Sequence, residues 1–244
     1  MEEGPRPRER FLLKLSGEVL AGGQGHGIDP GKVSELAFEL IALSSLGYQP
    51  GVVAGGGNFL RGRDTGGITR TTADYMGMLA TVMNSLALSD AVIRAGGRST
   101  VFSAFPFPEA GVEIFSPGKA TESFGKGEIL FFAGGTGNPH LSTDTAAALR
   151  AAQTGCGTLY KGTKVDGIYD RDPKLHSDAR RFDRMGYDQV LSMGLGFMDA
   201  AAVAVCRDAG IRIAVFDLTG PGNFSRVLSG ELPATVVEDQ LCRT

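Results

Sequence analysis

Cysteine is scarce in this sequence of 244 residues, which contains only Cys156, Cys206 and Cys242. The number is odd, the three residues are far apart, and no two of them form a CxxC pair. Disulfide frameworks and zinc sites need paired or clustered cysteines, so the sequence is typical of neither. We therefore predict reduced thiols, a cytoplasmic location and no metal ligands from the protein itself.

An excess of charge of one sign is also missing, since 24 Lys and Arg stand against 27 Asp and Glu, for a formal net charge of -3. No basic stripe of the kind that follows nucleic-acid backbones is present, which argues against a nucleic-acid partner. No run approaches the roughly 18 uninterrupted apolar residues of a membrane helix, so no membrane partner is expected. Residues 1–9 are charged, and we predict a mobile tail there.

Glycine, by contrast, is abundant, and many of the 36 glycines follow predicted strands, where backbone can approach a ligand closely. Predicted strands alternate with predicted helices, which indicates an α/β fold with a mostly parallel sheet and helices on both faces. A shift in composition near residue 155 predicts one domain, 10–244, with lobes at 10–155 and 156–244. The expected strands are 11–15, 51–54, 100–104, 128–133, 158–161, 212–216 and 235–237, and the expected helices are 30–46, 71–95, 142–153, 187–193, 199–209 and 223–228.

The helix expected at 71–95 is the longest. Thr71 and Asp74 have the spacing of a capping box at its start. The apolar residues at helical spacing predict its core-facing stripe. That stripe comprises Tyr75, Leu79, Val82, Met83 and Leu86.

The stretch from Phe131 to Asp144 joins an apolar strand, a loop of small residues and a helix start that carries a carboxylate. Loops at the carboxyl ends of strands are where open α/β sheets bind ligands. Residues 135–138 offer backbone N–H groups, a hydroxyl and an amide, and the following helix adds its positive dipole end. This pattern predicts an anion-binding loop, although an ordinary tight strand-to-helix turn fits it equally well.

Three other segments carry residue types that suit a ligand. Lys14 interrupts the first apolar strand, so its ammonium either reaches solvent or points toward negative charge. Three successive glycines, 55–57, are conformationally costly, and we interpret them as a close backbone contact with a ligand. Residues 163–172 mix charges, a hydroxyl and a tyrosine, which is typical either of nucleotide binding or of a solvated loop.

Two glycine-rich segments resemble known motifs but fail on context. Gly22 to Gly27 contains GxGxG without a strand before it and a helix after it, so a dinucleotide site is rejected and a flexible loop is expected. Gly157 to Lys164 has the glycine spacing of a P-loop but reverses its final Lys and Thr. The P-loop mechanism therefore does not transfer.

Five motifs, in the right order from about residue 10 to residue 239, closely resemble those of the bacterial UMP kinases, which belong to the amino-acid kinase superfamily. They are Lys14-Leu15-Ser16-Gly17-Glu18; Gly55-Gly56-Gly57-Asn58 with Arg61-Gly62; Asp74-Tyr75-Met76-Gly77-Met78-Leu79-Ala80-Thr81; Gly135-Thr136-Gly137-Asn138-Pro139 with Thr143-Asp144; and Lys164-Val165-Asp166-Gly167.

The resemblance implies a three-layer α/β/α sandwich, a homohexamer, and phosphoryl transfer from MgATP to UMP, giving UDP and ADP in pyrimidine nucleotide biosynthesis. It implies catalytic roles for Lys14, Arg61 and Asp144, and we expect Asp144 to orient Lys14 or a metal-bound water. The implied ATP residues are Lys14, Leu15, Ser16, Gly17, Gly57, Arg61, Thr163, Tyr169 and Asp172. The implied UMP residues are Gly56, Asp74, Thr136, Gly137, Asn138, Pro139, His140, Leu141, Ser142 and Thr143.

Regulation is implied as well. The loop of Gly22, Gly23, Gln24, Gly25, His26 and Gly27 matches a region associated with activation by GTP in some members, and UTP is the expected inhibitor. Two other functions stay open. One is a kinase of the same superfamily acting on a carboxylate such as N-acetylglutamate or aspartate, against which Asp74 argues. The other is a storage protein that binds nucleotide and oxyanion, against which the combination of Lys14, Arg61 and Asp144 argues.

Overall fold

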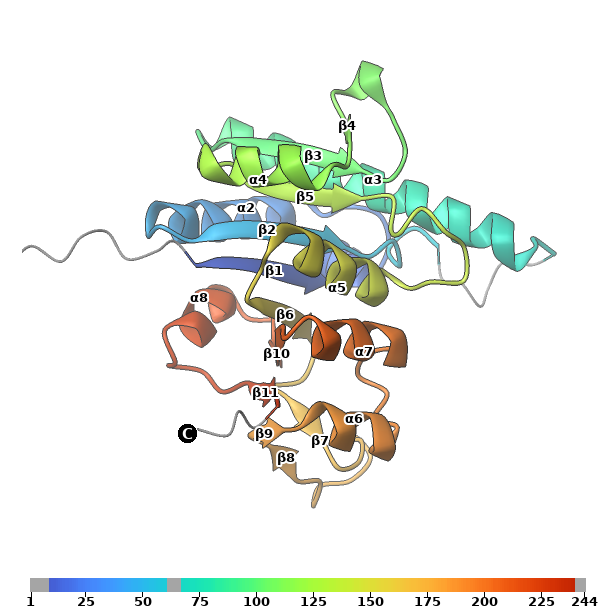
Figure 1. Ribbon diagram of the computed structural model, residues 1–244, viewed down its shortest axis with the longest axis vertical. Coiled ribbons are helices and arrows are strands. Elements are labelled where there is room, and N and C mark those ends of the chain that lie inside the picture. The colour runs from blue at the N-terminus through green and yellow to red at the C-terminus, as the bar shows by residue number, and fades with distance from the viewer. Residues whose placement is uncertain (1–8, 61–66, 240–244) are drawn as a thin grey trace, which may run out of the picture.

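A parallel β-sheet forms the centre of the protein (Figure 1). The computed structural model describes residues 9–60 and 67–239. In these residues the main sheet has nine strands in the order β4-β3-β5-β2-β1-β6-β10-β11-β9, and all pairs except β10 with β11 are parallel. The strands are β1 (Arg10–Leu15), β2 (Gln49–Ala54), β3 (Ser99–Ser103), β4 (Glu113–Ile114), β5 (Ile129–Ala133), β6 (Thr158–Thr163), β9 (Arg184–Met185), β10 (Arg212–Asp217) and β11 (Thr235–Val237), with β7 (Ile168–Tyr169) and β8 (Arg181–Phe182) forming a separate antiparallel pair.

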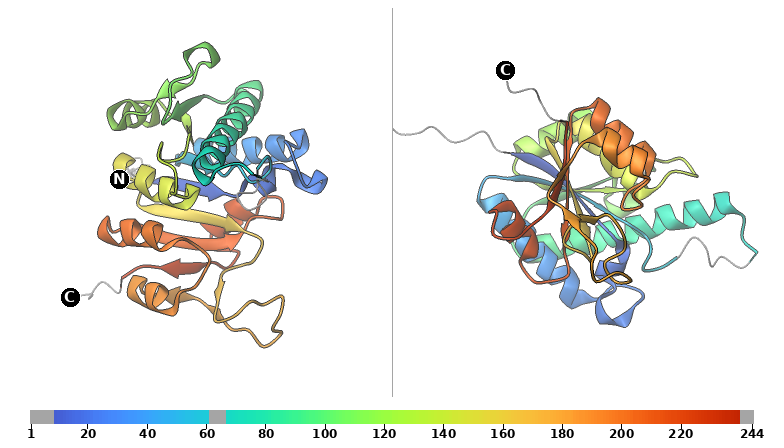
Figure 2. Two further views of the ribbon diagram at one scale, coloured as in Figure 1. Left: turned by 90° about the vertical axis from the view of Figure 1, so that its right-hand side faces the viewer. Right: turned by 90° about the horizontal axis from the view of Figure 1, so that it is seen from below.

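Helices cover both faces of the sheet. They are α1 (Gly17–Leu20), α2 (Pro30–Ser45), α3 (Arg70–Arg94), α4 (Pro117–Gly125), α5 (Thr143–Thr154), α6 (Tyr187–Met193), α7 (Ala200–Asp208) and α8 (Asn223–Leu228), and two short 3-10 turns span Gly22–Gln24 and Pro108–Ala110. The right-hand view in Figure 2 places α2 and α3, blue and cyan, on the side opposite α5 and α7. The predicted three-layer α/β/α sandwich is confirmed.

The core has two halves because side chains alternate along each strand. Leu12 and Phe132 belong to the half under α4, α5 and α7. Their neighbours Phe11 and Phe131 belong to the half under α2 and α3. Both faces are therefore buried, which explains the continuous apolar runs in these strands.

The predicted helices and strands agree with the structure to within a few residues, and the last strand matches at both ends. Asp29 accepts from the N–H groups of Gly31 and Lys32 at the start of α2, and Ser142 caps α5. The sheet continues across residue 155, since β1 pairs with both β2 and β6. The division into two lobes stays a prediction, and residues 1–8 of the predicted tail lie outside the described residues.

Helix α3 differs from the prediction in two respects. Its N-cap is Thr69, whose hydroxyl accepts from the Thr72 N–H, so the capping box at Thr71 is wrong. The predicted core stripe is also wrong in large part, because Tyr75, Leu79 and Met83 are exposed. Smaller residues face the sheet instead, including Ala73, Ala80, Thr81, Asn84, Ser85, Leu88 and Ala91.

By length and hydropathy alone, α3 could span a membrane. Its most apolar window is 56% buried within the fold, where the helix packs on β3 and β5. A buried core helix passes the same test of composition, so the packing of α3 accounts for its apolar character.

Candidate active site

The loops that carry the predicted site residues meet at one edge of the sheet. Strands β1, β2 and β5 are parallel neighbours in the order β5-β2-β1, so their carboxyl ends lie together. The loops that follow β1 and β2 are in close contact, since the Gly55 N–H donates to the Leu15 carbonyl at 2.9 Å. A Cβ at Gly17 would lie 2.4 Å from Asn58 Oδ1, so only glycine fits this contact.

A buried cluster of charges lies at this edge. Lys14 and Lys161 are directly opposite each other on neighbouring strands β1 and β6, and the two lysines share one carboxylate. Asp144, in the first turn of α5, has Oδ1 2.8 Å from Lys14 Nζ and Oδ2 2.5 Å from Lys161 Nζ. The two ammonium groups would repel each other without this carboxylate. Of the two positions predicted for the Lys14 ammonium, in solvent or toward negative charge, the structure shows the second.

The contact with Lys161 meets the geometry of a hydrogen bond. The contact with Lys14 has the distance of an ion pair, while Asp144 Oδ1 has no well-aligned hydrogen bond among the described residues. We therefore treat Lys14 as held by charge and Lys161 as held by charge and direction.

Burial and charge act against each other in the pKa values of this cluster. Burial alone would raise the pKa of Asp144, but Lys14 and Lys161 outweigh it and lower that pKa. For Lys161, burial and the charge of Lys14 outweigh the attraction of Asp144 and lower its pKa to about 8. Asp144 is therefore ionised at neutral pH. Lys161 loses its proton at a much lower pH than an ordinary lysine, near pH 8.

The glycines after β2 have different reasons for being glycine. A Cβ on Gly56 would lie 2.6 Å from the Gly77 carbonyl of α3, so packing requires that glycine. A Cβ on Gly57 would meet only Glu18, at 3.9 Å. The interpretation of all three as a ligand contact is therefore too broad, and Gly57 is the one whose backbone has open space beside it.

Asp74 and the loop after β5 form the second part of the site. Asp74 accepts from the His140 N–H at 2.8 Å and from Arg70 Nε at 3.0 Å. Burial would raise the pKa of Asp74, but these hydrogen bonds and the charge of Arg70 lower it overall. His140 has φ +67°, so this hydrogen bond holds the loop in a left-handed turn.

A pocket opens between α3 and this loop, with an empty volume of about 580 Å³ that includes space open to solvent. It brings together several of the predicted UMP residues. Its lining includes Gly56, Asp74, Leu141 and Thr143, together with Gly57, Gly77 and Gly135. Thr136 and Asn138 bond to each other instead, through the Asn138 N–H and the Thr136 hydroxyl at 3.1 Å.

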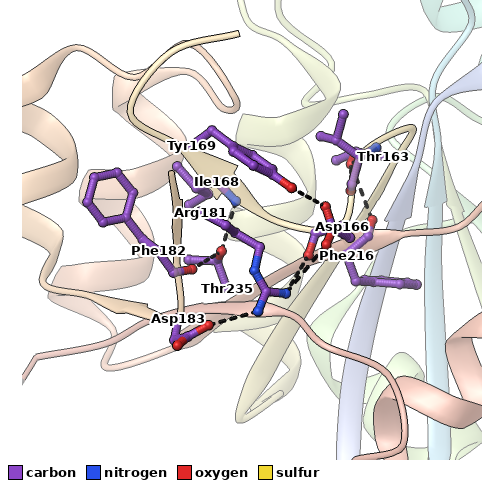
Figure 3. Close-up of polar contacts among 10 residues, drawn as sticks. Thr163, Asp166, Ile168, Tyr169, Arg181, Phe182, Asp183, Phe216 and Thr235 are labelled. Atoms are coloured by element: carbon purple, nitrogen blue, oxygen red, sulfur yellow. Dashed lines mark hydrogen bonds and ion pairs between the residues drawn. The ribbon is translucent and has the colours of Figure 1, made fainter. Parts of the chain in front are cut away.

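A second pocket, with an empty volume of about 1080 Å³, lies beyond β6 and is lined by Lys164, Tyr169 and Asp172 among others. Figure 3 shows how its wall is fixed: the Tyr169 hydroxyl donates to Asp166 Oδ1 at 2.6 Å, and Arg181 lies against the same aspartate. Asp172 Oδ1 accepts from the Lys174 N–H. This segment is an anchored loop that forms one wall of a cavity.

The Thr163 side chain is hydrogen-bonded within the protein. Its hydroxyl has one proton, which it donates to the Val165 carbonyl at 2.6 Å, and the Phe216 carbonyl lies within hydrogen-bond distance on the other side, at 3.2 Å (Figure 3). It also accepts from the Val165 N–H. Thr163 therefore shapes the turn after β6, and its contact with ATP stays a prediction.

Two functional candidates were missed from the sequence, and one predicted residue is not described. Lys161 was assigned no role, and its position opposite Lys14 becomes evident only from the strand pairing. Asp199 caps α7 and accepts from the hydroxyls of Ser142 and Thr145, which fixes the start of α5 beside Asp144. Arg61, predicted to bind ATP and take part in catalysis, lies outside the described residues.

The residues at this edge cannot enclose a metal ion by themselves, but they can accept one that is already bound to phosphates. Among the residues that the structure describes, no three His, Cys, Asp or Glu side chains are grouped to hold one. Asp144 is already shared by two ammonium groups. A complete protein cage for a metal does not fit here, whereas Mg²⁺ that arrives on phosphates and takes at most one carboxylate does.

The glycine loop before α2 is more ordered than a flexible loop. It starts with a 3-10 turn, and Gly22, Gly25 and Gly27 have positive φ. Its end is attached to Asn58 by two hydrogen bonds, from the Gly27 N–H to the Asn58 carbonyl at 2.9 Å and from Asn58 Nδ2 to the Gly27 carbonyl at 2.7 Å. Gly157 to Lys164, the other rejected motif, is mostly strand β6 and not a phosphate loop.

The sequence and fold match known proteins over nearly their whole length. The model of the Amino acid kinase family matches residues 9–217. A uridylate kinase of Zymomonas mobilis is 50% identical over 95% of this chain and 97% of its own, and one of Roseobacter denitrificans is 46% identical over 96% and 99%. The crystal structure of a UMP kinase from Ureaplasma parvum, 33% identical, superposes with a TM-score of 0.91 over 95% of this chain and 99% of its own. The chain therefore belongs to the amino acid kinase family, and within it to the uridylate kinase branch.

Proposed function

We propose that this protein transfers the γ-phosphoryl group of MgATP to UMP, giving UDP and ADP. The observation that carries the proposal is the cluster of Lys14, Asp144 and Lys161 at the sheet edge between two pockets. Asp144 directly follows Thr143, which lines the pocket beside α3, and Lys161 leads into the loop that lines the other pocket. The similarity to uridylate kinases over more than nine-tenths of the chain supports the same activity.

Charge placement does most of the chemistry in this proposal. Phosphoryl transfer needs donor and acceptor phosphates in line and positive charge near the oxygens of the transferring group. Lys14 supplies that charge, Asp144 aims it, and Lys161 keeps Asp144 in place. A phosphate oxygen of UMP is already anionic and needs no general base. Mg²⁺ that arrives with ATP would supply positive charge that neutralises the phosphates, and Asp144 is the carboxylate of the cluster that would hold it.

The two pockets divide the ligands between them. We assign UMP to the pocket of Gly56, Asp74 and Thr143, with the loop 136–143 reading the uracil ring by donors and acceptors. We assign the base and ribose of ATP to the pocket of Tyr169 and Asp172, and its phosphates to Lys14, Leu15, Ser16, Gly17 and Gly57. Arg61 is proposed to add charge on the phosphate side.

The pH profile tests the part assigned to Lys161. Because the pKa of Lys161 is lowered to about 8, its ammonium loses a proton above that pH and one positive charge leaves the cluster. We expect kcat/KM for ATP to fall above about pH 8, since this ratio reports groups of the free enzyme. Lys161→Met should be slower but should lack that fall. Lys32→Met, far from the cluster, should keep the wild-type profile, and a fall that persists in Lys161→Met would contradict the assignment.

Assembly and regulation complete the proposal. One face of α3 presents Tyr75, Met76, Leu79 and Met83, which are 42%, 39%, 50% and 45% exposed. Exposed apolar side chains so grouped are typical of contacts between subunits, and we propose that this face joins copies within a homohexamer. Sedimentation equilibrium should give six chains per particle, and a monomer would refute this.

Regulation and location are proposed on the family resemblance and the composition alone. We propose activation by GTP at Gly22–Gly27, inhibition by UTP and a cytoplasmic location.

Neither alternative function gains a specific observation from the structure or from the relatives. ADP release should be measured with UMP, CMP, dUMP, N-acetylglutamate and aspartate as acceptors. The proposal predicts strong turnover with UMP and far less with the others. Strong turnover with a carboxylate, or nucleotide binding without turnover, would replace the proposed function.

A further inference from the structure

The buried face of α3 carries two polar side chains whose hydrogen bonds have no role so far: Asn84, and Thr81, which also lines the pocket assigned to UMP. Thr81 is 2% exposed and Asn84 is fully buried, three residues apart on one helix. A buried hydroxyl or amide destabilises a protein unless it is hydrogen-bonded, so the partners of these side chains matter. Those partners belong to two different loops of the active site.

Asn84 forms a reciprocal pair with Asn58, which follows the triple glycine. Each side-chain amide donates to the other's oxygen, at 2.8 and 2.9 Å. Asn84 Nδ2 also donates to the Gly55 carbonyl at 2.8 Å. Asn58 Oδ1 lies directly beside Gly17, in the segment assigned to the ATP phosphates. The pair is therefore a buried support under Gly17 and Gly57, which are assigned to the ATP phosphates, while Gly56 of the same loop lines the pocket assigned to UMP.

Thr81 holds the other loop in the same manner. Its hydroxyl accepts from the Gly134 N–H at 2.8 Å and donates to the Met78 carbonyl at 2.6 Å. Gly134 has φ +72° and starts the loop assigned to UMP. Thr81 thus fixes the point at which the acceptor loop leaves β5.

Residues three apart in an α-helix lie on the same face, and a helix packed along its length is rigid. We propose that Asn84 and Thr81 are positioning residues, one for each substrate: Asn84, paired with Asn58, for the ATP-phosphate loops, and Thr81 for the UMP loop. Helix α3 then sets the distance between donor and acceptor phosphates. This inference rests on the proposed assignment of the two loops.

The test is a double dissociation between two variants. Asn84→Leu keeps the approximate volume and removes the hydrogen bonds to Gly55 and Asn58, and Thr81→Val keeps the shape and removes the bond to Gly134. The dissociation constants for UMP and for the magnesium complex of AMP-PNP should be measured separately by calorimetry, with kcat and the melting temperature. Ser85→Ala is the matched control, because Ser85 is a buried neighbour whose hydroxyl has no hydrogen-bond partner among the described residues.

Asn84→Leu should weaken AMP-PNP binding on the order of tenfold and UMP binding clearly less, and Thr81→Val should do the reverse. Ser85→Ala should change neither. If Asn84→Leu does not fold, Asn58→Ala should show the same loss for AMP-PNP. Equal weakening of both ligands in each variant, or no change in either, would overturn the inference. Wild-type protein that binds both ligands without making UDP would instead refute the proposed function and leave the binding test valid.

Discussion

Replacing Lys14 by alanine is expected to lower kcat for UMP phosphorylation by a factor on the order of 10² or more, because a preorganised charge at the transferring group is lost. The fold should survive the change. Asp144 keeps its hydrogen-bonded partner Lys161, so no buried carboxylate is left without a cation. The rate is measured by ADP release at saturating ATP and UMP, and folding by thermal unfolding.

Lys32→Ala is the matched control for this prediction. Lys32 is a partly buried lysine whose Nζ pairs with Glu35 at 2.9 Å on α2, on the other side of the sheet from α5. It should leave kcat within about twofold of wild type, as a surface ion pair contributes little. A folded Lys14→Ala variant with near-normal kcat would remove Lys14 from the mechanism.

Asp144→Ala is expected to affect stability and catalysis together. Removing the carboxylate leaves Lys14 and Lys161 facing each other, and breaking a buried ion pair in this way lowers the free energy of unfolding by about 3–5 kcal/mol. Lys14 also loses the group that aims it, so kcat should fall on the order of 10² as well. Urea unfolding and the ADP assay measure the two effects.

A second substitution separates charge from packing in this result. The double variant Asp144→Ala, Lys161→Met should be more stable than Asp144→Ala alone, because one unpaired cation is removed. A double variant that is equally or less stable would contradict this explanation by charge.

The contribution of Asp144 to stability depends on pH. Since the pKa of Asp144 is lowered in the folded protein, its contribution to the free energy of unfolding is present above the unfolded pKa near 3.8 and is lost as pH falls through the folded pKa. The stability difference from wild type should therefore shrink in acid.

The layers of the fold were predictable because their signals are local. Continuous apolar runs such as 129–133 mark strands buried on both faces, and Asp29-Pro30 and Ser142 mark helix starts by their own chemistry. The orientation of α3 was not predictable in the same way. Tyr75, Leu79 and Met83 face outward, while the buried face combines alanines and small polar residues with apolar ones such as Leu88 and Val92. Periodicity alone cannot distinguish a core from a surface that is apolar for another reason.

The site was predictable where one segment carries the chemistry and hidden where two strands share it. Lys14, Asp74 and Asp144 stand out in their own motifs, and the structure places Asp74 against the loop of His140 and Asp144 against Lys14. A role for Lys161 could not be predicted, because its partner Lys14 is about 150 positions away in sequence and adjacent only in the sheet. The role of Asn84 could not be predicted for the same reason, since its hydrogen-bond partners belong to a loop distant in sequence.

Transfer of the γ-phosphoryl group of ATP onto the phosphate of UMP can be followed directly with a label on that group. Purified protein should be incubated with γ-³²P-labelled ATP, UMP and Mg²⁺, and the labelled products separated by chromatography. We expect labelled UDP in an amount equal to the ADP formed, with Lys14→Ala forming little of either. Label that appears as inorganic phosphate, or that stays in ATP while wild-type protein is folded and saturated with both substrates, would contradict it.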